Sequence, residues 1–373
     1  LGVVLQEQGR FEEAIAQHRE AVALKPGYAE AFYNLGIALQ YHGKAEEAAL
    51  MYRQALSLNP SSAPACNNLG VLLQGEGKSA EAVEQYHRAL TLRPHYGEAY
   101  CNLGNVLKEQ GKLEEAVACY RRALALKPSD GLKILLATIL PVIPESREHL
   151  LSARRNFERQ IAELMNEGLS LDDPCREVCT TNFYLAYHGL NDRKLQVQIA
   201  QLYEQACPSL LYTAPHCVNP QRKRAMDKIK IGFVSRFFTA HSVAKSFQGL
   251  LSLLPREKFT VSVIFVPPVS GDEVTKTFLE FADVTIVLSG GLSDARERIA
   301  REELDVLFYT DIGMEPFTYF LAFSRLAPVQ CVGGGHPATT GIRNLDYYVS
   351  GEDLEPEGAE DHYSERLVRL KGL

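Results

Sequence analysis

The 34 residues 97–130, GEAYCNLGNVLKEQGKLEEAVACYRRALALKPSD, decide how the first third of this chain folds, because their pattern recurs along it with a fixed period. A Leu-Gly pair returns every 34 residues, and a second glycine, two alanines and a proline return at the same interval. The recurring positions are Leu1-Gly2, Leu35-Gly36, Leu69-Gly70 and Leu103-Gly104; Gly9, Gly43, Gly77 and Gly111; Ala14, Ala48, Ala82 and Ala116; Ala21, Ala55, Ala89 and Ala123; and Pro26, Pro60, Pro94 and Pro128. This agreement indicates one structural unit used several times.

Each recurring residue suits one position in a pair of helices. Residues of the Gly36 and Ala48 classes are small, so the two helices of a pair can approach closely. Glycines of the Gly43 class can take a positive φ in the turn between the helices, and the prolines end the second helix. The pattern is that of the tetratricopeptide repeat, whose pairs stack because one pair cannot bury its apolar face alone. We therefore expect an α-solenoid over residues 1–130. Its complete repeats are expected at 29–62, 63–96 and 97–130, after one partial repeat.

One asparagine in each complete repeat comes immediately before the Leu-Gly pair, at Asn34, Asn68 and Asn102. This position faces the concave groove of a tetratricopeptide superhelix. An amide side chain offers a donor and an acceptor, so it can bind a peptide backbone without reading its sequence. We predict that these asparagines bind extended protein segments. The alternative is that asparagine is a common residue here because it helps the helices to pack.

Composition narrows the possible partners. The chain of 373 residues is 46% hydrophobic and 23% charged, with a net charge of −7, so neither nucleic acid nor an anionic membrane is an expected partner. No apolar run of membrane-spanning length and no signal peptide are visible. The eight cysteines are scattered and favour free thiols, which predicts a cytoplasmic protein. The pair Cys175 and Cys179 has no second pair at ligand spacing, so we expect no metal site.

After Pro128 the repeat stops, and two further regions follow. We predict a helical connector over residues 131–222, with amphipathic stretches at Glu145–Glu167 and Arg193–Ala206. From Lys228 strand and helix patterns alternate, which predicts a Rossmann-like lobe over residues 223–373, with a parallel sheet covered on both faces. The expected strands are Ile229–Ser235, Thr260–Val266, Val284–Leu288, Asp305–Thr310 and Val329–Val332. The expected helices are Val243–Leu254, Glu273–Phe281, Ser293–Glu303 and Pro316–Arg325.

Ligands of such sheets bind beyond the carboxyl ends of the strands, so the loops there hold the candidate site residues. The loop after the first strand contains His241, immediately before a helix. The loop after the fourth strand is Thr310-Asp311-Ile312-Gly313, and the loop after the fifth contains three glycines and His336. A dinucleotide fingerprint, a phosphate-binding P-loop, a serine nucleophile elbow and a metal-ligand cluster are all missing. Each histidine has a structural and a functional interpretation, and both stay open on position alone.

Several short stretches resemble the O-linked N-acetylglucosaminyltransferase family, which includes SPINDLY-like and bacterial members. They are Leu185-Ala186-Tyr187-His188-Gly189; Ile231-Gly232-Phe233-Val234-Ser235, followed by His241; Arg325-Leu326-Ala327-Pro328-Val329-Gln330; Gly335-His336-Pro337-Ala338-Thr339-Thr340-Gly341; Asp346-Tyr347-Tyr348; and His362-Tyr363-Ser364-Glu365-Arg366-Leu367. The resemblance implies an inverting glycosyltransferase of two facing Rossmann-like lobes, the GT-B arrangement. The repeats would deliver a protein, and a Ser or Thr hydroxyl would attack the anomeric carbon of a nucleotide sugar.

The resemblance also implies roles for particular residues. His241 matches the active-site histidine of the first lobe, where a proton-accepting or an orienting role suits an imidazole. The stretch that approaches the donor sugar matches Gly335, His336, Pro337, Thr339, Thr340 and Gly341. The family needs no metal and no other cofactor, since lysines and helix N-termini of the second lobe meet the charge of the diphosphate.

Two departures from the family pattern bear on the substrate. Lys245 stands where animal members have a second histidine, and Phe237-Phe238-Thr239-Ala240 replaces an acidic, Gly-Asn-containing loop. Both changes resemble the bacterial and SPINDLY-like branch. N-acetylglucosamine from its UDP derivative is therefore the leading donor, and fucose is the alternative.

The sequence also predicts incompleteness, because the match includes one lobe and the repeats begin inside a helix pair. We expect residues 1–373 alone to show no transferase activity. The competing hypothesis is a tetratricopeptide interaction module that carries a non-catalytic transferase remnant. A transferase acting on a lipid or a small molecule is disfavoured, because a groove for protein would serve no purpose there.

Overall fold

The computed structural model describes residues 1–218, 227–334 and 338–371. It contains two compact units, Leu1–Ser129 and Asp130–Leu373. The first boundary falls within one residue of the predicted end of the repeats. All eight cysteines are free thiols, as predicted.

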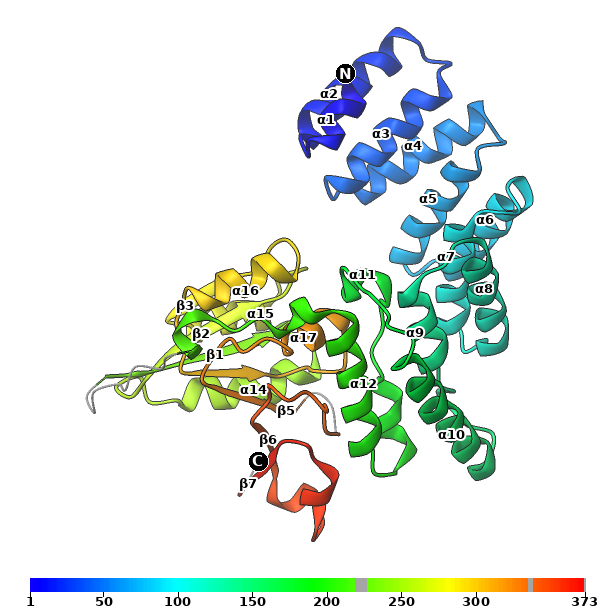
Figure 1. Ribbon diagram of the computed structural model, residues 1–373. Helices are drawn as coiled ribbons and strands as arrows, with labels where there is room; N and C mark the ends of the chain where they lie inside the picture. The colour runs from blue at the N-terminus through cyan, green and yellow to red at the C-terminus, as the bar shows by residue number, and fades with distance from the viewer. Residues whose placement is uncertain (219–226, 335–337, 372–373) are drawn as a thin grey trace. The chain divides into compact units, whose positions relative to one another are not determined.

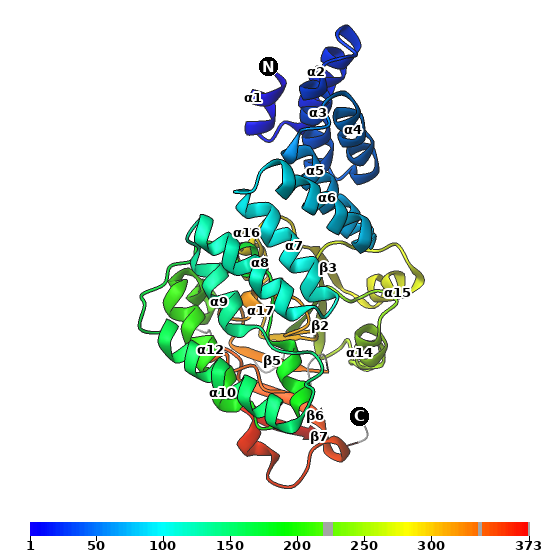
Figure 2. The same cartoon turned by 90° about the vertical axis from the view of Figure 1, so that its right-hand side faces the viewer.

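The first unit consists of helices that follow one another in pairs (Figures 1 and 2). Their bounds are α1 (Gly2–Glu7), α2 (Phe11–Leu24), α3 (Ala29–Tyr41), α4 (Ala45–Leu58), α5 (Ala63–Gly75), α6 (Ser79–Leu92), α7 (Gly97–Glu109) and α8 (Leu113–Leu126). Each second helix ends two residues before its proline. The turn glycines Gly9, Gly43, Gly77 and Gly111 have φ values of 74°, 81°, 76° and 76°, which confirms their predicted conformation.

The glycine of each Leu-Gly pair lies against an aromatic ring of the second helix. A Cβ added to Gly36 would lie 2.6 Å from Cε1 of Tyr52, and Gly70 and Gly104 face Tyr86 and Tyr120 in the same way. All three tyrosine side chains are fully buried. The predicted close approach of the two helices is therefore confirmed, and its partner is a ring packed flat against the helix backbone.

The second unit contains a parallel sheet with helices on both sides (Figure 1). The strands are β1 (Ile229–Ser235), β2 (Phe259–Phe265), β3 (Val284–Val287), β4 (Val306–Tyr309), β5 (Val329–Gly333), β6 (Tyr347–Gly351) and β7 (Arg366–Leu370). The helices between them are α14 (Ser242–Leu253), α15 (Glu273–Phe281), α16 (Leu292–Ala300) and α17 (Pro316–Leu321), and the 3-10 turns η3 (Glu352–Leu354) and η4 (Ala359–His362) lie between β6 and β7. The spatial order β3-β2-β1-β4-β5-β6-β7 is that of a doubly wound Rossmann-like sheet, as predicted.

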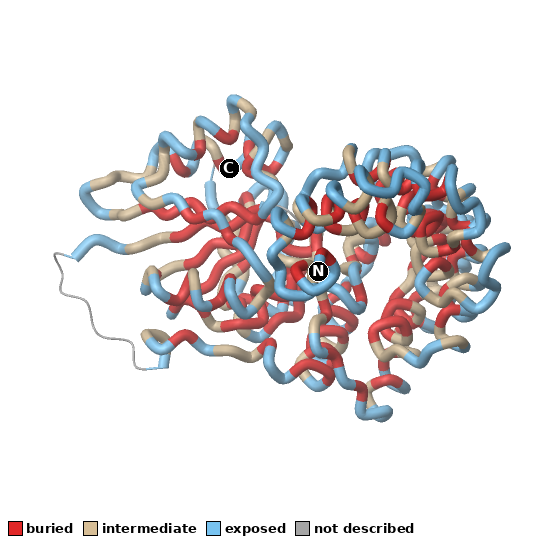
Figure 3. The backbone as a smooth tube through the Cα atoms, turned by 90° about the horizontal axis from the view of Figure 1, so that it is seen from above, coloured by how far each residue is buried: buried red, intermediate tan, exposed pale blue. Residues whose placement is uncertain are grey.

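Alternate residues of the central strands enter two separate cores. Phe233 of β1 and Phe308 of β4 pack with α14 and α15, whereas Val234 and Tyr309 pack on the other face with α16 and α17. This is why the strands read as continuous apolar runs in the sequence. The central strands β1, β2, β4 and β5 are buried along most of their length, and the tube through the middle of the sheet is accordingly red in Figure 3.

The connector consists of two long helices, α10 (Arg147–Leu164) and α12 (Arg193–Ala206), and several short ones, and it completes the second unit. The short ones are α9 (Asp130–Thr138), α11 (Pro174–Glu177), η1 (Phe183–His188), η2 (Pro208–Leu211) and α13 (Pro215–Val218). Tyr203 of α12 makes edge-to-face contacts with Tyr319, Phe320 and Phe323 around α17. We predicted the connector as a region of its own, but these shared contacts join it to the lobe in one compact unit.

Candidate active site

The sheet changes winding direction between β1 and β4. These strands pair in parallel, with Val234 opposite Tyr309, and the chain leaves them towards opposite edges of the sheet. The loops after β1 and β4 therefore meet at their carboxyl ends, where doubly wound sheets bind ligands. The predicted His241 loop and the Thr310–Gly313 loop both lie at this point.

A buried carboxylate joins the two loops. Oδ2 of Asp311 accepts hydrogen bonds from the Ser235 hydroxyl at 3.0 Å and from the backbone N–H of Arg236 at 2.9 Å. Asp311 is fully buried, and its Oδ1 has no hydrogen-bond partner among the described residues. Burial raises its pKa to about 7, and the nearby Glu315 acts in the same direction. The half-exposed Arg236 guanidinium lies 3.8 Å from the Glu315 carboxylate, so one cation and two acids line this edge.

His241 is the N-cap of α14, at the end of the loop that begins with Arg236. Its Nδ1 accepts the backbone N–H of Val243 at 3.2 Å. The ring stacks on Phe237, with centroids 4.5 Å apart and planes 29° from parallel. Both contacts fix the orientation of the imidazole, which is half-buried.

The hydrogen bond at Nδ1 determines which tautomer of His241 is present. Because Nδ1 accepts a hydrogen bond, the proton of the neutral ring is on Nε2. In this conformation Nε2–H can donate to an oxygen of a ligand, whereas taking a proton at Nε2 would need the other tautomer. The geometry thus favours the orienting role of His241 over the role of a base.

The loop after β5 begins against the helix that His241 caps. Gly334 has a φ of 76°, and a Cβ there would lie 2.6 Å from Cε2 of Phe247 in α14. A larger residue would push the loop away from the helix. Three of the predicted donor-binding residues, Gly335, His336 and Pro337, lie outside the described residues.

The other predicted donor-binding residues are engaged inside the protein. The Thr339 hydroxyl donates to Oε2 of Glu365 at 2.6 Å, and the hydroxyl and N–H of Thr340 both donate to Oε1. Gly341 has a φ of 74°, and a Cβ there would lie 2.2 Å from the backbone carbon of Gln196 in α12. These residues hold the loop against β7 and α12. Donor binding by them stays a prediction.

Two of the repeat asparagines also have partners within their own unit. Nδ2 of Asn68 donates to the hydroxyl of Tyr52 at 3.3 Å, and Nδ2 of Asn102 donates to Oδ1 of Asn67 at 2.9 Å. The backbone carbonyl of Asn34 accepts from Gln6. The packing role that the sequence left open is thus directly visible for Asn68 and Asn102. Peptide binding stays a prediction for all three asparagines.

His188, the histidine of the connector motif, belongs to a buried ion-pair cluster and not to the carboxyl edge. The Arg154 guanidinium lies 2.6 Å from Oδ1 of Asp192 and 3.4 Å from Nδ1 of His188. Burial lowers the pKa of His188 and raises the pKa of Asp192. The motif therefore ties α10 to the segment before α12, which is a structural role.

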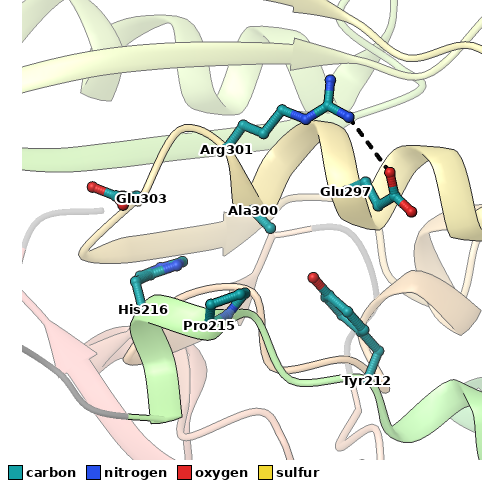
Figure 4. Close-up of a pocket in the computed structure, with 7 residues that line it drawn as sticks. All are labelled: Tyr212, Pro215, His216, Glu297, Ala300, Arg301 and Glu303. Carbon is teal, nitrogen blue, oxygen red and sulfur yellow. Dashed lines mark hydrogen bonds and ion pairs between the residues drawn. The ribbon is translucent and has the colours of Figure 1, made fainter.

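A hollow of about 270 Å³ lies at the opposite edge of the sheet (Figure 4). Its lining residues are Tyr212, Pro215, His216, Glu297, Ala300, Arg301 and Glu303. Glu303 lies three residues before β4, and His216 is bonded to the carbonyl of Leu304, so the hollow faces the amino ends of the strands. It is separate from the switch point between β1 and β4.

The described residues contain neither a membrane-spanning helix nor a cluster of metal ligands. No described helix is long and apolar enough to cross a membrane. Within residues 1–218, 227–334 and 338–371, no group of three or more His, Cys, Asp or Glu side chains could hold a metal ion.

Comparison with known families agrees with this architecture. Residues 190–372 match the model of glycosyl transferase family 41. Two tetratricopeptide models match the first unit, one at 29–62 and 97–130 and the other at 2–43 and 75–111. These matches confirm the resemblance seen in the sequence.

Similar proteins include enzymes of plants and bacteria. A probable UDP-N-acetylglucosamine–peptide N-acetylglucosaminyltransferase, SEC of Arabidopsis thaliana, is 39% identical over 187 residues, 48% of this chain and 19% of the relative. A UDP-glucose:protein N-beta-glucosyltransferase of Actinobacillus pleuropneumoniae is 28% identical over 148 residues, 38% of this chain and 22% of the relative. A solved O-GlcNAc transferase of Thermobaculum terrenum shares the fold, with a TM-score of 0.64 and 23% identity over 92% of this chain and 57% of that chain. The chain thus spans about a fifth of the length of these two curated relatives.

Proposed function

Since this chain joins tetratricopeptide repeats to a glycosyltransferase family 41 domain, we propose that it serves protein O-glycosylation: an inverting transfer of a sugar from a nucleotide sugar to Ser or Thr hydroxyls. The observation that carries the proposal is the family match over residues 190–372, which include the β1 and β4 loops at the carboxyl edge of the sheet. The repeats supply the reason for a protein acceptor, because their stacked helices form an extended surface for a chain segment.

In the proposed reaction His241 acts at the acceptor and the sugar. The Ser or Thr oxygen bonds to the anomeric carbon as the bond from that carbon to the diphosphate breaks, and the hydroxyl proton passes to the released diphosphate. Nε2–H of His241 donates to the leaving oxygen, where negative charge develops, and the Val243 N–H holds the ring in that tautomer. The loop after β5 approaches the donor sugar, and the groove asparagines Asn34, Asn68 and Asn102 contact the protein segment. The proposal includes no metal and no cofactor besides the nucleotide sugar, and it places the reaction in the cytoplasm.

UDP-N-acetylglucosamine is the proposed donor, because the SEC relative matches with 39% identity over 187 residues. A second candidate is glucose, since the UDP-glucose:protein N-beta-glucosyltransferase of Actinobacillus pleuropneumoniae also matches, at 28% over 148 residues. Fucose stays an alternative on the strength of Lys245 and the Phe237–Ala240 loop. The non-catalytic alternative is a repeat module that binds proteins without transfer.

The test uses the protein expressed from its whole coding sequence, with UDP-N-acetylglucosamine, UDP-glucose and GDP-fucose supplied separately. Mass spectrometry of acceptor proteins identifies which sugar is added and to which side chain. We expect N-acetylhexosamine on Ser or Thr, at a rate unchanged by EDTA. Transfer of hexose to Asn would replace the proposed donor and acceptor, and protein binding without transfer of any sugar would support the non-catalytic alternative. Residues 1–373 alone are expected to be inactive, because the resemblance assigns the diphosphate to a second lobe.

A further inference from the structure

The carboxylate of Asp272 bonds to two different elements at once. Its Oδ1 accepts the backbone N–H of Thr275 at 2.8 Å, which caps the N-terminus of α15. Its Oδ2 accepts the backbone N–H of Ala240 at 2.9 Å and the hydroxyl of Thr239. The Ser270 hydroxyl donates to the same oxygen at 2.6 Å. Capping explains only the first of these bonds, because the bonds to residues 239 and 240 reach into the His241 loop.

The same helix holds a third residue of that loop. The hydroxyl of Thr275 donates to the backbone carbonyl of Phe238 at 2.8 Å. The Phe238 ring stacks on Phe278, with centroids 4.4 Å apart. Residues 238, 239 and 240 are therefore all bound to α15 or its cap, and His241 follows them directly in the chain.

These contacts decide where the imidazole lies. The first residue of the loop, Arg236, is held by Asp311, and the last residues before His241 are held by Asp272. The donors around Asp272, first the Ser270 and Thr239 hydroxyls, keep its pKa well below the usual range of a carboxyl group. Asp272 is therefore ionised at neutral pH.

We infer that Asp272 is a positioning residue for His241: it fixes the Thr239–Ala240 backbone and thereby holds the imidazole in place at the carboxyl edge of the sheet. The catalytic meaning of this inference rests on the proposed function, whereas the contact itself does not. Asp272 touches neither substrate nor donor in this account, and it acts through the loop.

The variant that separates the two bonds is Asp272→Ser in the full-length protein. Serine is a good N-cap, and its hydroxyl can replace Oδ1 and accept from Thr275, but no atom of serine replaces Oδ2, which accepts from Ala240. The control is Ser146→Ala, which removes the cap of α10, where Ser146 accepts from His149 at 3.0 Å. That helix lies in the connector, outside the His241 loop.

Two measurements are made on each variant. Amide hydrogen exchange of the segment 239–243 should speed up by about 3- to 10-fold in Asp272→Ser, the equivalent of one lost hydrogen bond. The His241 ring signals in an NMR spectrum of histidine-labelled protein should shift or broaden. The rate constant kcat for sugar transfer should fall by about tenfold or more, with the KM for the donor unchanged. Ser146→Ala should change none of these quantities.

The outcomes separate this inference from the proposed function. Unchanged exchange and unchanged His241 signals in Asp272→Ser would overturn the inference, whatever the activity. If the loop loosens in Asp272→Ser but the unmodified protein transfers no sugar, the contact between Asp272 and the His241 loop is supported and the proposed function is refuted. A loosened loop with an unchanged kcat would show that Asp272 does not position His241 for transfer.

Discussion

Replacement of Asp311 by asparagine should remove a pH-dependent loss of stability. The carboxyl group is fully buried between β1 and β4, and burial raises its pKa from 3.8 to about 7. The folded protein therefore binds this proton more tightly than the unfolded chain does. Its contribution to stability is complete below pH 4 and is lost as the pH rises to about 7.

The size of the effect follows from the two pKa values. A difference of about three pKa units at 1.36 kcal/mol each lowers the free energy of unfolding by about 4 kcal/mol between low and high pH. The asparagine side chain keeps an oxygen for the Ser235 hydroxyl and the Arg236 N–H, and it does not titrate. We expect Asp311→Asn and the unmodified protein to be nearly equal in stability at pH 3.5, and the variant to be more stable by up to about 4 kcal/mol at pH 8.

Urea unfolding followed by circular dichroism at both pH values measures this difference, since the chain has no tryptophan to report it. The two compact units are fitted as separate transitions. Asp353→Asn, at an exposed position, is the matched control. Equal pH dependence in Asp311→Asn and the unmodified protein would refute the reasoning, because Asp311 would then be ionised in the folded state without cost.

Two further substitutions test packing, one in each compact unit. Gly104→Ala places a methyl group 2.6 Å from the buried Tyr120 ring and should destabilise the repeats by about 1–3 kcal/mol. The control Gly97→Ala, in the same helix, meets only ordinary contacts and should be neutral or slightly stabilising. Equal effects of the two changes in thermal unfolding would contradict the close approach of the helices. Arg154→Met leaves the Asp192 carboxylate, whose side chain is 2% exposed, without its cation and should cost about 3–5 kcal/mol in urea unfolding. A loss below about 1 kcal/mol would mean that the ion pair is not needed to keep Asp192 buried.

The helices of the first unit could be predicted from the sequence because every contact that defines them is local or repeats with the period. The small size of Gly36 predicted that the two helices of its repeat approach closely. The sequence did not identify Tyr52 as the facing residue, because a partner on another helix depends on how the pair packs. The same limit applies to Asn68, whose position was found but whose bond to Tyr52 was not.

In the second unit the strands with continuous apolar runs were predicted, and β1 was predicted to the residue. The strands β6 (Tyr347–Gly351) and β7 (Arg366–Leu370) were missed. They lie towards one edge of the sheet, where β7 is only partly buried and begins with a charged residue. An edge strand with one covered face has too short an apolar pattern to stand out.

The same limit applies to the candidate site, where the local sequence pattern predicted the position of a loop but not its contacts with distant segments. The loop after β1 was located from the strand pattern, and the half-buried His241 lies in it as predicted. The importance of Asp311 and Asp272 was not foreseen, since it depends on β4 and α15 lying beside that loop. A carboxylate directly after a buried strand was the one signal in the sequence that could have marked Asp311.

The edge built by β1 and β4 is proposed to carry out sugar transfer through His241, and the substitution His241→Asn tests this role. His241→Asn keeps a side-chain oxygen where Nδ1 accepts the Val243 N–H, so α14 stays capped, but it removes Nε2–H. In the full-length protein we expect the initial rate of transfer from the nucleotide sugar to protein to fall by at least about 100-fold, with an unchanged melting temperature. A transfer rate within about twofold of the unmodified enzyme would remove His241 from the reaction and contradict the account.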